Sequence, residues 1–190
     1  MALGIHLRQN TVSALSDFTS PALIIPHLQG LDRMAVIGEL AQAMKTDHRM
    51  PASSRFYQAV LNRELLASTE MGKGVAFPHA RLPELKDLFF ALGRCAQPLR
   101  WADTSPPRVR FVFLVAAPES DSGEYLRLIS GLVRLAKEGR LINQMEAAGD
   151  ASRIFEVLQQ VKLAARWGKT EPGSESDGGS ETHAKTTQGG

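Results

Sequence analysis

Residues 71–81, Met-Gly-Lys-Gly-Val-Ala-Phe-Pro-His-Ala-Arg, combine residue types that are suited to chemistry on an anion. The apolar run 75–77 predicts a short buried strand, and Pro78 should end it because proline cannot donate to a sheet ladder. His79 would then lie at the strand end, with the cation Arg81 two residues further on. A histidine held beside a cation at a sheet edge is suited to handling a phosphoryl group. A capped strand end with a hydrogen-bonded structural histidine explains the same residues equally well at this point.

The composition predicts a folded domain with a sizeable core and gives no electrostatic reason to expect a nucleic-acid partner. The chain has 190 residues, 43% of them hydrophobic, and a formal net charge of +2. Its basic residues are scattered and are not interleaved with aromatic ones. The single cysteine, Cys95, lies in an apolar run, which predicts a reduced, buried and inert thiol. No apolar run approaches the length of a membrane span and no signal-peptide pattern is present, so we expect a cytoplasmic protein without membrane insertion.

Changes in composition along the chain predict one domain between two loosely patterned ends. Residues 1–15 are weakly patterned and are expected to form a disordered arm or an added edge strand. From 167 onward Gly, Ser, Thr and acidic residues dominate, and such a segment cannot bury enough apolar surface to offset its ordering entropy. We therefore expect a domain over 16–166 and a disordered tail over 167–190.

Alternating helix and strand patterns predict an α/β fold, α+β by some criteria, with a small mixed sheet flanked by helices on both faces. The first part of the chain should form an edge strand over 20–26, a helix over 31–44 with Asp32 in its first turn, and a helix from Ser53 or Ser54 to about Leu66. Two further strands are expected, one over 88–92 bounded by Pro83 and Pro98, and a central one over 108–116 stopped by Pro118. Three helices should follow: one capped by Asp121 or Ser122 and ending near Gly139, a short one around 141–145, and a last one capped by Asp150 with inner positions to Ala165.

The helix that ends near Leu66 should deliver Arg63 and Thr69 to the start of the glycine-bearing stretch. Arg63 is thereby a second candidate cation for an anion at His79. An ordinary surface ion pair between Arg63 and Glu64, which would contribute little to stability, is the alternative interpretation.

The string formed by Leu61-Asn-Arg-Glu, Ser68-Thr and residues 71–81 resembles the EIIA domains of the phosphotransferase system, of the fructose/mannitol type that includes the nitrogen-regulatory EIIA proteins. The order of elements agrees from about Phe18 to Ala165. The resemblance implies a phosphocarrier: His79 is at the phosphoacceptor position and Arg63 at the arginine near the phosphoryl group. It also implies an HPr-like phosphocarrier protein as donor, with a sugar-transporter EIIB domain or a regulated transporter or kinase as the next partner.

The chemistry of such a transfer requires a neutral imidazole nitrogen as nucleophile and neutralisation of developing charge. Arg63, Arg81 and the backbone N–H groups of Gly72 and Gly74 are the candidates for holding the phosphoryl oxygens. Thr69 is a candidate hydroxyl donor, although a local turn hydrogen bond is an equally good explanation of it.

The chain departs from the family pattern at two positions. Active members carry a second histidine that faces the first, early in the helix after the central strand, and that position is Tyr125 here. Tyrosine can donate a hydrogen bond to a phosphoryl oxygen and is neutral near pH 7. The family's glycine after Ser-Thr is Glu70 here, whose carboxylate would repel phosphate if it pointed inward.

Two hypotheses of function follow. The first is a working phosphocarrier with His79 as a transient phosphohistidine, and the second is a non-catalytic EIIA-like domain that acts by docking on a partner protein. A metal site is a weak third idea, since His79 has no second histidine and no clustered cysteines to bind with. We therefore expect neither a metal nor a cofactor.

Overall fold

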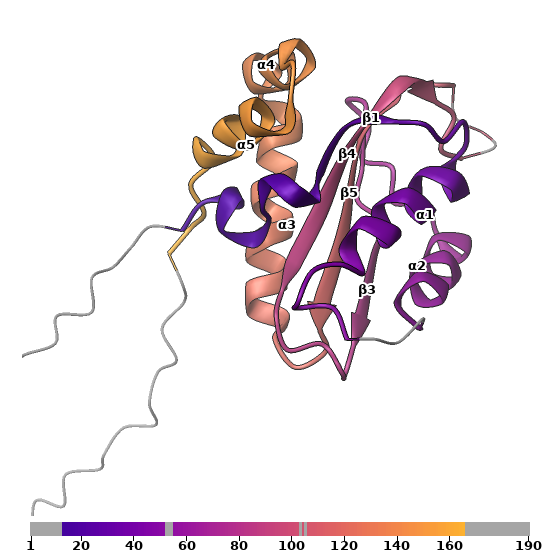
Figure 1. Cartoon of the computed structure of the whole chain (residues 1–190), viewed down its shortest axis with the longest axis vertical. Coiled ribbons are helices and arrows are strands. Elements are labelled where there is room, and N and C mark those ends of the chain that lie inside the picture. The colour runs from indigo at the N-terminus through magenta and orange to yellow at the C-terminus, as the bar shows by residue number, and fades with distance from the viewer. Residues whose placement is uncertain (1–12, 52–54, 103, 105, 166–190) are drawn as a thin grey trace, which may run out of the picture.

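A five-stranded mixed sheet forms the centre of the molecule (Figure 1). The computed structural model describes residues 13–51, 55–102, 104 and 106–165, and all statements below refer to them. The strands are β1 (Ile24–Leu28), β2 (Val75–Ala76), β3 (His79–Leu82), β4 (Phe89–Leu99) and β5 (Val109–Pro118). Strand β5 pairs antiparallel with β4 and parallel with both β2 and β3, while β1 pairs parallel with β4 at the other edge. The sequence prediction of a mixed sheet is confirmed.

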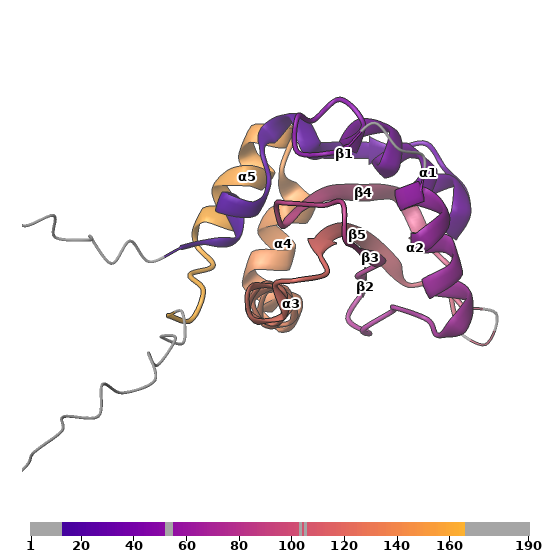
Figure 2. The same cartoon turned by 90° about the horizontal axis from the view of Figure 1, so that it is seen from below.

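Helices cover both faces of this sheet, as Figure 2 shows. Helices α1 (Arg33–Met44) and α2 (Arg55–Leu66) lie on one face, and α3 (Ser122–Lys137), α4 (Gly139–Ala147) and α5 (Ala151–Gln159) on the other. Two short 3-10 helices, η1 (Leu15–Phe18) and η2 (Pro21–Leu23), precede β1. Each face has its own apolar core, and alternate residues of β5 contribute to one or the other. The prediction of a central strand covered on both sides is therefore correct.

Aspartates cap three helices: Asp121 and Asp150 do so as expected, and Asp32, expected in the first turn of its helix, precedes α1 and caps it. The side chains of Asp32, Asp121 and Asp150 each accept a hydrogen bond from the backbone N–H three residues later, at the starts of α1, α3 and α5. Such caps satisfy N–H groups that have no partner inside the helix. The serines expected to cap α2, Ser53 and Ser54, lie outside the described residues.

Some predicted boundaries are wrong. Strand β4 continues through Pro98, and α5 ends at Gln159, so Ala165 is exposed and is not on a helix. Leu15, expected in the arm, is fully buried, and its N–H donates to the Val161 carbonyl. Residues 1–12 of the expected arm and the whole expected tail, 167–190, lie outside the described residues, as does residue 166.

The segment that carries the histidine also differs from the prediction. Pro78 ends β2 but does not end the pairing with β5, because its carbonyl accepts from the Val115 N–H and β3 begins at the next residue. His79 is thus the first residue of a strand, opposite Val115, rather than the last residue of one. Strands β2 and β3 both pair parallel with the same edge of β5, and this pairing fixes the position of His79 along that edge.

Candidate functional site

The His79 ring is held in one tautomer by the chain that precedes it. Its Nδ1 lies 2.9 Å from the carbonyl oxygen of Phe77, across the break between β2 and β3. A carbonyl oxygen can only accept, so Nδ1 carries the proton, and in the neutral ring Nε2 keeps its lone pair. The residue is half-buried. The structure therefore offers one imidazole nitrogen as a nucleophile.

The surroundings favour the neutral form of this imidazole. Burial is the largest cause and lowers the pKa of His79 from its ordinary 6.5, while the hydrogen bond to Phe77 raises it. The charges of Arg63 and Arg81 lower the pKa of His79 further, and that of Glu64 raises it. The net direction is downward, so the ring is uncharged at neutral pH, as a nucleophilic nitrogen requires.

Tyr125 of α3 lies against the histidine. The two ring centroids are 5.7 Å apart and the rings are inclined by 47°. Burial raises the pKa of Tyr125 above its usual range, so its hydroxyl keeps a proton that it can donate. The sequence prediction that Tyr125 occupies the position facing His79 agrees with this geometry.

Arg81 joins β3 to the beginning of α3. Its Nη2 donates to the Glu119 carbonyl at 2.6 Å and contacts the Ser122 hydroxyl at 2.8 Å. The guanidinium carbon lies 5.5 Å from the centroid of the Tyr125 ring, within the range of a cation–π contact. Arg81 thus adds positive charge near the imidazole and fixes the helix that carries Tyr125.

Arg63 brings a second positive charge from the other face of the sheet. It lies in the last turn of α2, is half-buried, and donates from Nη1 to the Ala67 carbonyl at 3.0 Å. Its charge lowers the pKa of both His79 and Tyr125, so it adds positive potential at this site. The structure brings His79, Tyr125 and Arg81 into contact around Tyr125, and Arg63 adds its charge from α2.

Glu64 is a residue of this region whose position the sequence did not reveal. It is 4% exposed, and its carboxylate accepts from the Thr69 N–H at 3.0 Å, the Thr69 hydroxyl at 2.5 Å and the Trp101 indole N–H at 2.8 Å. Arg33 lies 3.8 Å from the same carboxylate. The interpretation of Glu64 as a partner of Arg63 in a surface pair is therefore wrong. The signal available in the sequence was Trp101, because a tryptophan that becomes buried needs an acceptor for its indole N–H.

Thr69 is accordingly removed from the candidate phosphate site. Its hydroxyl proton and its backbone N–H are both donated to Glu64, so neither is offered to a ligand. Glu70, the other uncertain position, forms an ion pair with Arg108 at 3.1 Å. These contacts anchor the loop between α2 and β2.

The candidate glycines lie too far from His79 to bind a group attached to it. The Gly74 carbonyl accepts from the Arg110 N–H, whereas His79 is opposite Val115 on the same strand. Five residues of extended chain span about 16 Å. Gly72 and Gly74 have φ of 70° and 78°, so their role in this chain is to form the turn that precedes β2.

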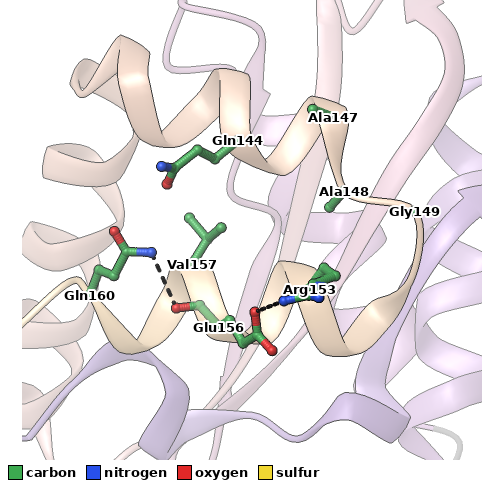
Figure 3. A pocket seen from close by; sticks show the side chains of 8 residues that line it. All are labelled: Gln144, Ala147, Ala148, Gly149, Arg153, Glu156, Val157 and Gln160. Carbon is green, nitrogen blue, oxygen red and sulfur yellow. Dashed lines mark hydrogen bonds and ion pairs between the residues drawn. The ribbon is translucent and has the colours of Figure 1, made fainter.

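Other regions of the described chain add no second site of this kind. Among the described residues, no group of three or more His, Cys, Asp or Glu side chains could hold a metal ion. A hollow of about 450 Å³ between α4 and α5 (Figure 3) is lined by residues outside the His79 site: Gln144, Ala147, Ala148, Gly149, Arg153, Glu156, Val157 and Gln160. No helix in the part of the chain that the structure describes is both long and apolar enough to cross a membrane.

Comparison with known proteins gives a consistent family. The sequence model described as "Phosphoenolpyruvate-dependent sugar phosphotransferase system, EIIA 2" matches residues 17–161. A nitrogen regulatory protein of Bradyrhizobium diazoefficiens is 29% identical over 144 residues, covering 76% of this chain and 94% of that protein.

Solved structures show the same fold. The nitrogen regulatory protein IIA-Ntr from Neisseria meningitidis matches with a TM-score of 0.66 at 20% identity, covering 76% of this chain and 98% of that one. A chain in the complex of enzyme IIAMTL and phosphorylated enzyme IIBMTL from Escherichia coli matches with a TM-score of 0.63 at 17% identity, covering 73% and 95%.

Proposed function

This chain belongs to the EIIA 2 family of the phosphoenolpyruvate-dependent sugar phosphotransferase system, and we propose on this premise that it is a phosphocarrier whose His79 takes a phosphoryl group on Nε2. The observation that supports the proposal most directly is the hydrogen bond of 2.9 Å between Nδ1 and the Phe77 carbonyl. That bond leaves the lone pair of Nε2 available in a ring whose pKa is lowered, with the charges of Arg63 and Arg81 acting on it.

The proposed transfer moves one phosphoryl group from a histidine nitrogen of the donor to Nε2 of His79. The lone pair of Nε2 forms a bond to phosphorus while the P–N bond of a phosphohistidine donor breaks, and the donor nitrogen keeps that electron pair. No proton has to leave His79, because Nδ1 retains its proton and continues to donate to Phe77. The positive charges of Arg63 and Arg81 stabilise the negative charge on the oxygens of the phosphoryl group, and the neutral hydroxyl of Tyr125 is a hydrogen-bond donor to them.

We propose an HPr-type phosphoprotein as donor and an EIIB-type domain, or a regulated target protein, as the next partner. The solved complex of enzyme IIAMTL with phosphorylated enzyme IIBMTL is the precedent for an EIIB partner. Exposed leucines adjoin the site residues in sequence: Leu65 and Leu66 follow Arg63 and are 72% and 84% exposed, and Leu126 follows Tyr125 and is 61% exposed. Exposed apolar side chains near a charged site suit a protein partner.

The test is phosphorylation of the purified chain by a phospho-HPr-type donor. We expect a mass increase of one phosphoryl group that is absent in His79→Ala, and NMR of the labelled protein should assign phosphorus to Nε2. Tyr125→Phe, which removes only the hydroxyl, should slow the transfer. Lack of labelling by every competent donor, or labelling that survives His79→Ala, would contradict the proposal.

A second candidate function is regulation by docking without phosphotransfer. Tyr125, at the position where active relatives are implied to carry a second histidine, favours it, as does the similarity to a nitrogen regulatory protein. Tyr125→His separates the two candidates. If the natural protein accepts no phosphoryl group but Tyr125→His does, and the natural protein still binds its partner, docking is the function.

A further inference from the structure

A series of hydrogen bonds connects the Glu64 carboxylate with the His79 ring. The carboxylate accepts from the backbone N–H of Thr69 at 3.0 Å and from the Thr69 hydroxyl at 2.5 Å. The Thr69 carbonyl in turn accepts from the Phe77 N–H at 3.1 Å, and the Phe77 carbonyl lies 2.9 Å from Nδ1 of His79. These contacts follow one another from the last turn of α2 to the imidazole.

The residues that form this series are shielded from solvent. Glu64, Thr69 and Phe77 are all buried. Water cannot replace a lost partner at a buried polar group, so each of these hydrogen bonds is costly to break. Phe77 also packs its ring against Phe113 of β5, with the ring centroids 5.5 Å apart. The Phe77 carbonyl that accepts from the imidazole is therefore held by contacts of both the backbone and the side chain of Phe77.

The same contacts connect α2 with the segment that carries the histidine. The hydrogen bond between Thr69 and Phe77 closes the segment between them, and Phe77 directly follows β2, which pairs with β5. Glu64 holds the Thr69 end of that segment against α2. Arg63, the residue before Glu64, donates to the Ala67 carbonyl in the same loop. The Glu64 carboxylate thus links the helix that supplies a cation with the strand that supplies the nucleophile.

We propose that Glu64 and Thr69 are positioning residues for His79, a role that rests on the proposed phosphocarrier function. Neither residue donates to the phosphoryl group. Together they hold the Phe77 peptide where its carbonyl accepts from Nδ1, and this keeps the lone pair of Nε2 free for the reaction. Displacement of that peptide allows the proton of the neutral ring to move to Nε2, and the nucleophilic lone pair is then lost.

Thr69→Val tests this role, because it removes the hydroxyl but keeps the size of the side chain, its backbone N–H and the charge of Glu64. NMR of the ring nitrogens should find the proton of neutral His79 on Nδ1 in the natural protein, and partly on Nε2 in Thr69→Val. A misplacement of about 1 Å costs about 100-fold in rate, so the loss of one of two anchors should slow transfer from a phospho-HPr-type donor about tenfold. Thr69→Ser, which keeps the hydroxyl, should restore both the tautomer and the rate.

Trp101→Phe is the matched control. It removes a different donor to the Glu64 carboxylate, one that does not lead to Phe77. It should lower the stability but leave the tautomer of His79 and the rate of transfer unchanged. An unchanged tautomer and rate in Thr69→Val would overturn the positioning role, and so would equal changes in Trp101→Phe.

Hydrogen exchange of the natural protein decides the matter if Thr69→Val does not fold. The amides of Thr69 and Phe77 should open together, with protection factors that agree within about threefold. Much faster exchange at Phe77 would overturn the proposal.

The NMR measurements need no phosphoryl donor, so they separate this inference from the proposed function. If no donor labels the natural protein while the tautomer still responds to Thr69→Val, the phosphocarrier function fails and the positioning of the ring is supported. If the natural protein and folded Thr69→Val are labelled at the same rate with the same tautomer, the positioning role fails alone.

Discussion

Replacement of Trp101 by phenylalanine removes one hydrogen-bond donor from the buried carboxylate of Glu64 while an aromatic ring remains in the core. A hydrogen bond to a charged group contributes about 1.5–3 kcal/mol to the free energy of unfolding. For a domain of this size, each kcal/mol changes the melting temperature by about 2–4 °C, so we expect a decrease of about 3–12 °C. The smaller ring also leaves a cavity, which adds to the loss and has to be separated from the hydrogen bond.

A double-mutant cycle makes that separation. The free energy of unfolding is measured in urea for the natural protein, Trp101→Phe, Glu64→Gln and the double variant. The free-energy cost of the cavity is the same whether Trp101→Phe is made in the natural protein or in Glu64→Gln, so it cancels in the comparison. The remaining coupling free energy between the indole and the carboxylate should be about 1–3 kcal/mol. The wavelength shift of the Trp101 emission in Glu64→Gln provides an independent sign of the lost contact.

A coupling below about 0.5 kcal/mol would refute the reasoning, because it would mean that the indole N–H loses nothing when the carboxylate is replaced. The same variants test the connection to the site. The charge of Glu64 raises the pKa of His79, so Glu64→Gln should lower that pKa further, whereas Trp101→Phe keeps the charge and should leave the pKa nearly unchanged.

Three other predictions concern His79, the buried thiol of Cys95 and the glycine turn before β2. The His79 imidazole should titrate below its ordinary 6.5 in an NMR titration, mainly because it is buried, and Arg63→Gln should raise the pKa. Because the folded pKa is the lower one, the stability due to His79 is complete above pH 6.5 and is lost as the pH falls, so His79→Asn should flatten the urea-unfolding free energy over that range. Burial raises the pKa of Cys95 to about 12, so a thiol reagent should modify it only after unfolding, and rapid reaction of the native protein would contradict this. Gly72→Ala and Gly74→Ala should each cost about 1–2 kcal/mol in unfolding experiments, more at Gly74, where a Cβ would lie 3.1 Å from a backbone oxygen, and neither should abolish labelling of His79.

Local signals in the sequence were sufficient for most of the fold. The uninterrupted apolar run at 111–117 requires a strand covered on both faces, and an aspartate ahead of an amphipathic stretch begins a helix at Asp32, Asp121 and Asp150. These features depend on neighbours within a few residues. The resemblance of the string around Pro78 and His79 to EIIA domains then added the family.

Contacts between distant segments could not be predicted in the same way. The indole of Trp101 and the carboxylate of Glu64 are 37 residues apart, and only the packing of α2 against the sheet brings them together. Likewise, the glycines at 72 and 74 are near His79 in sequence, but an extended strand moves the chain too far for them to share a ligand with it.

The sequence by itself determined that a histidine follows a proline after a short strand, that cations and a tyrosine are available, and which elements would carry them. The tertiary structure decided which nitrogen of His79 is free, that Tyr125 and Arg81 meet beside it, and that Glu64 and Thr69 bind each other instead of a ligand. The physical reason is that hydrogen-bond direction, burial and charge proximity depend on distances through space. Those distances are fixed only when β3, α2 and the beginning of α3 pack around β5.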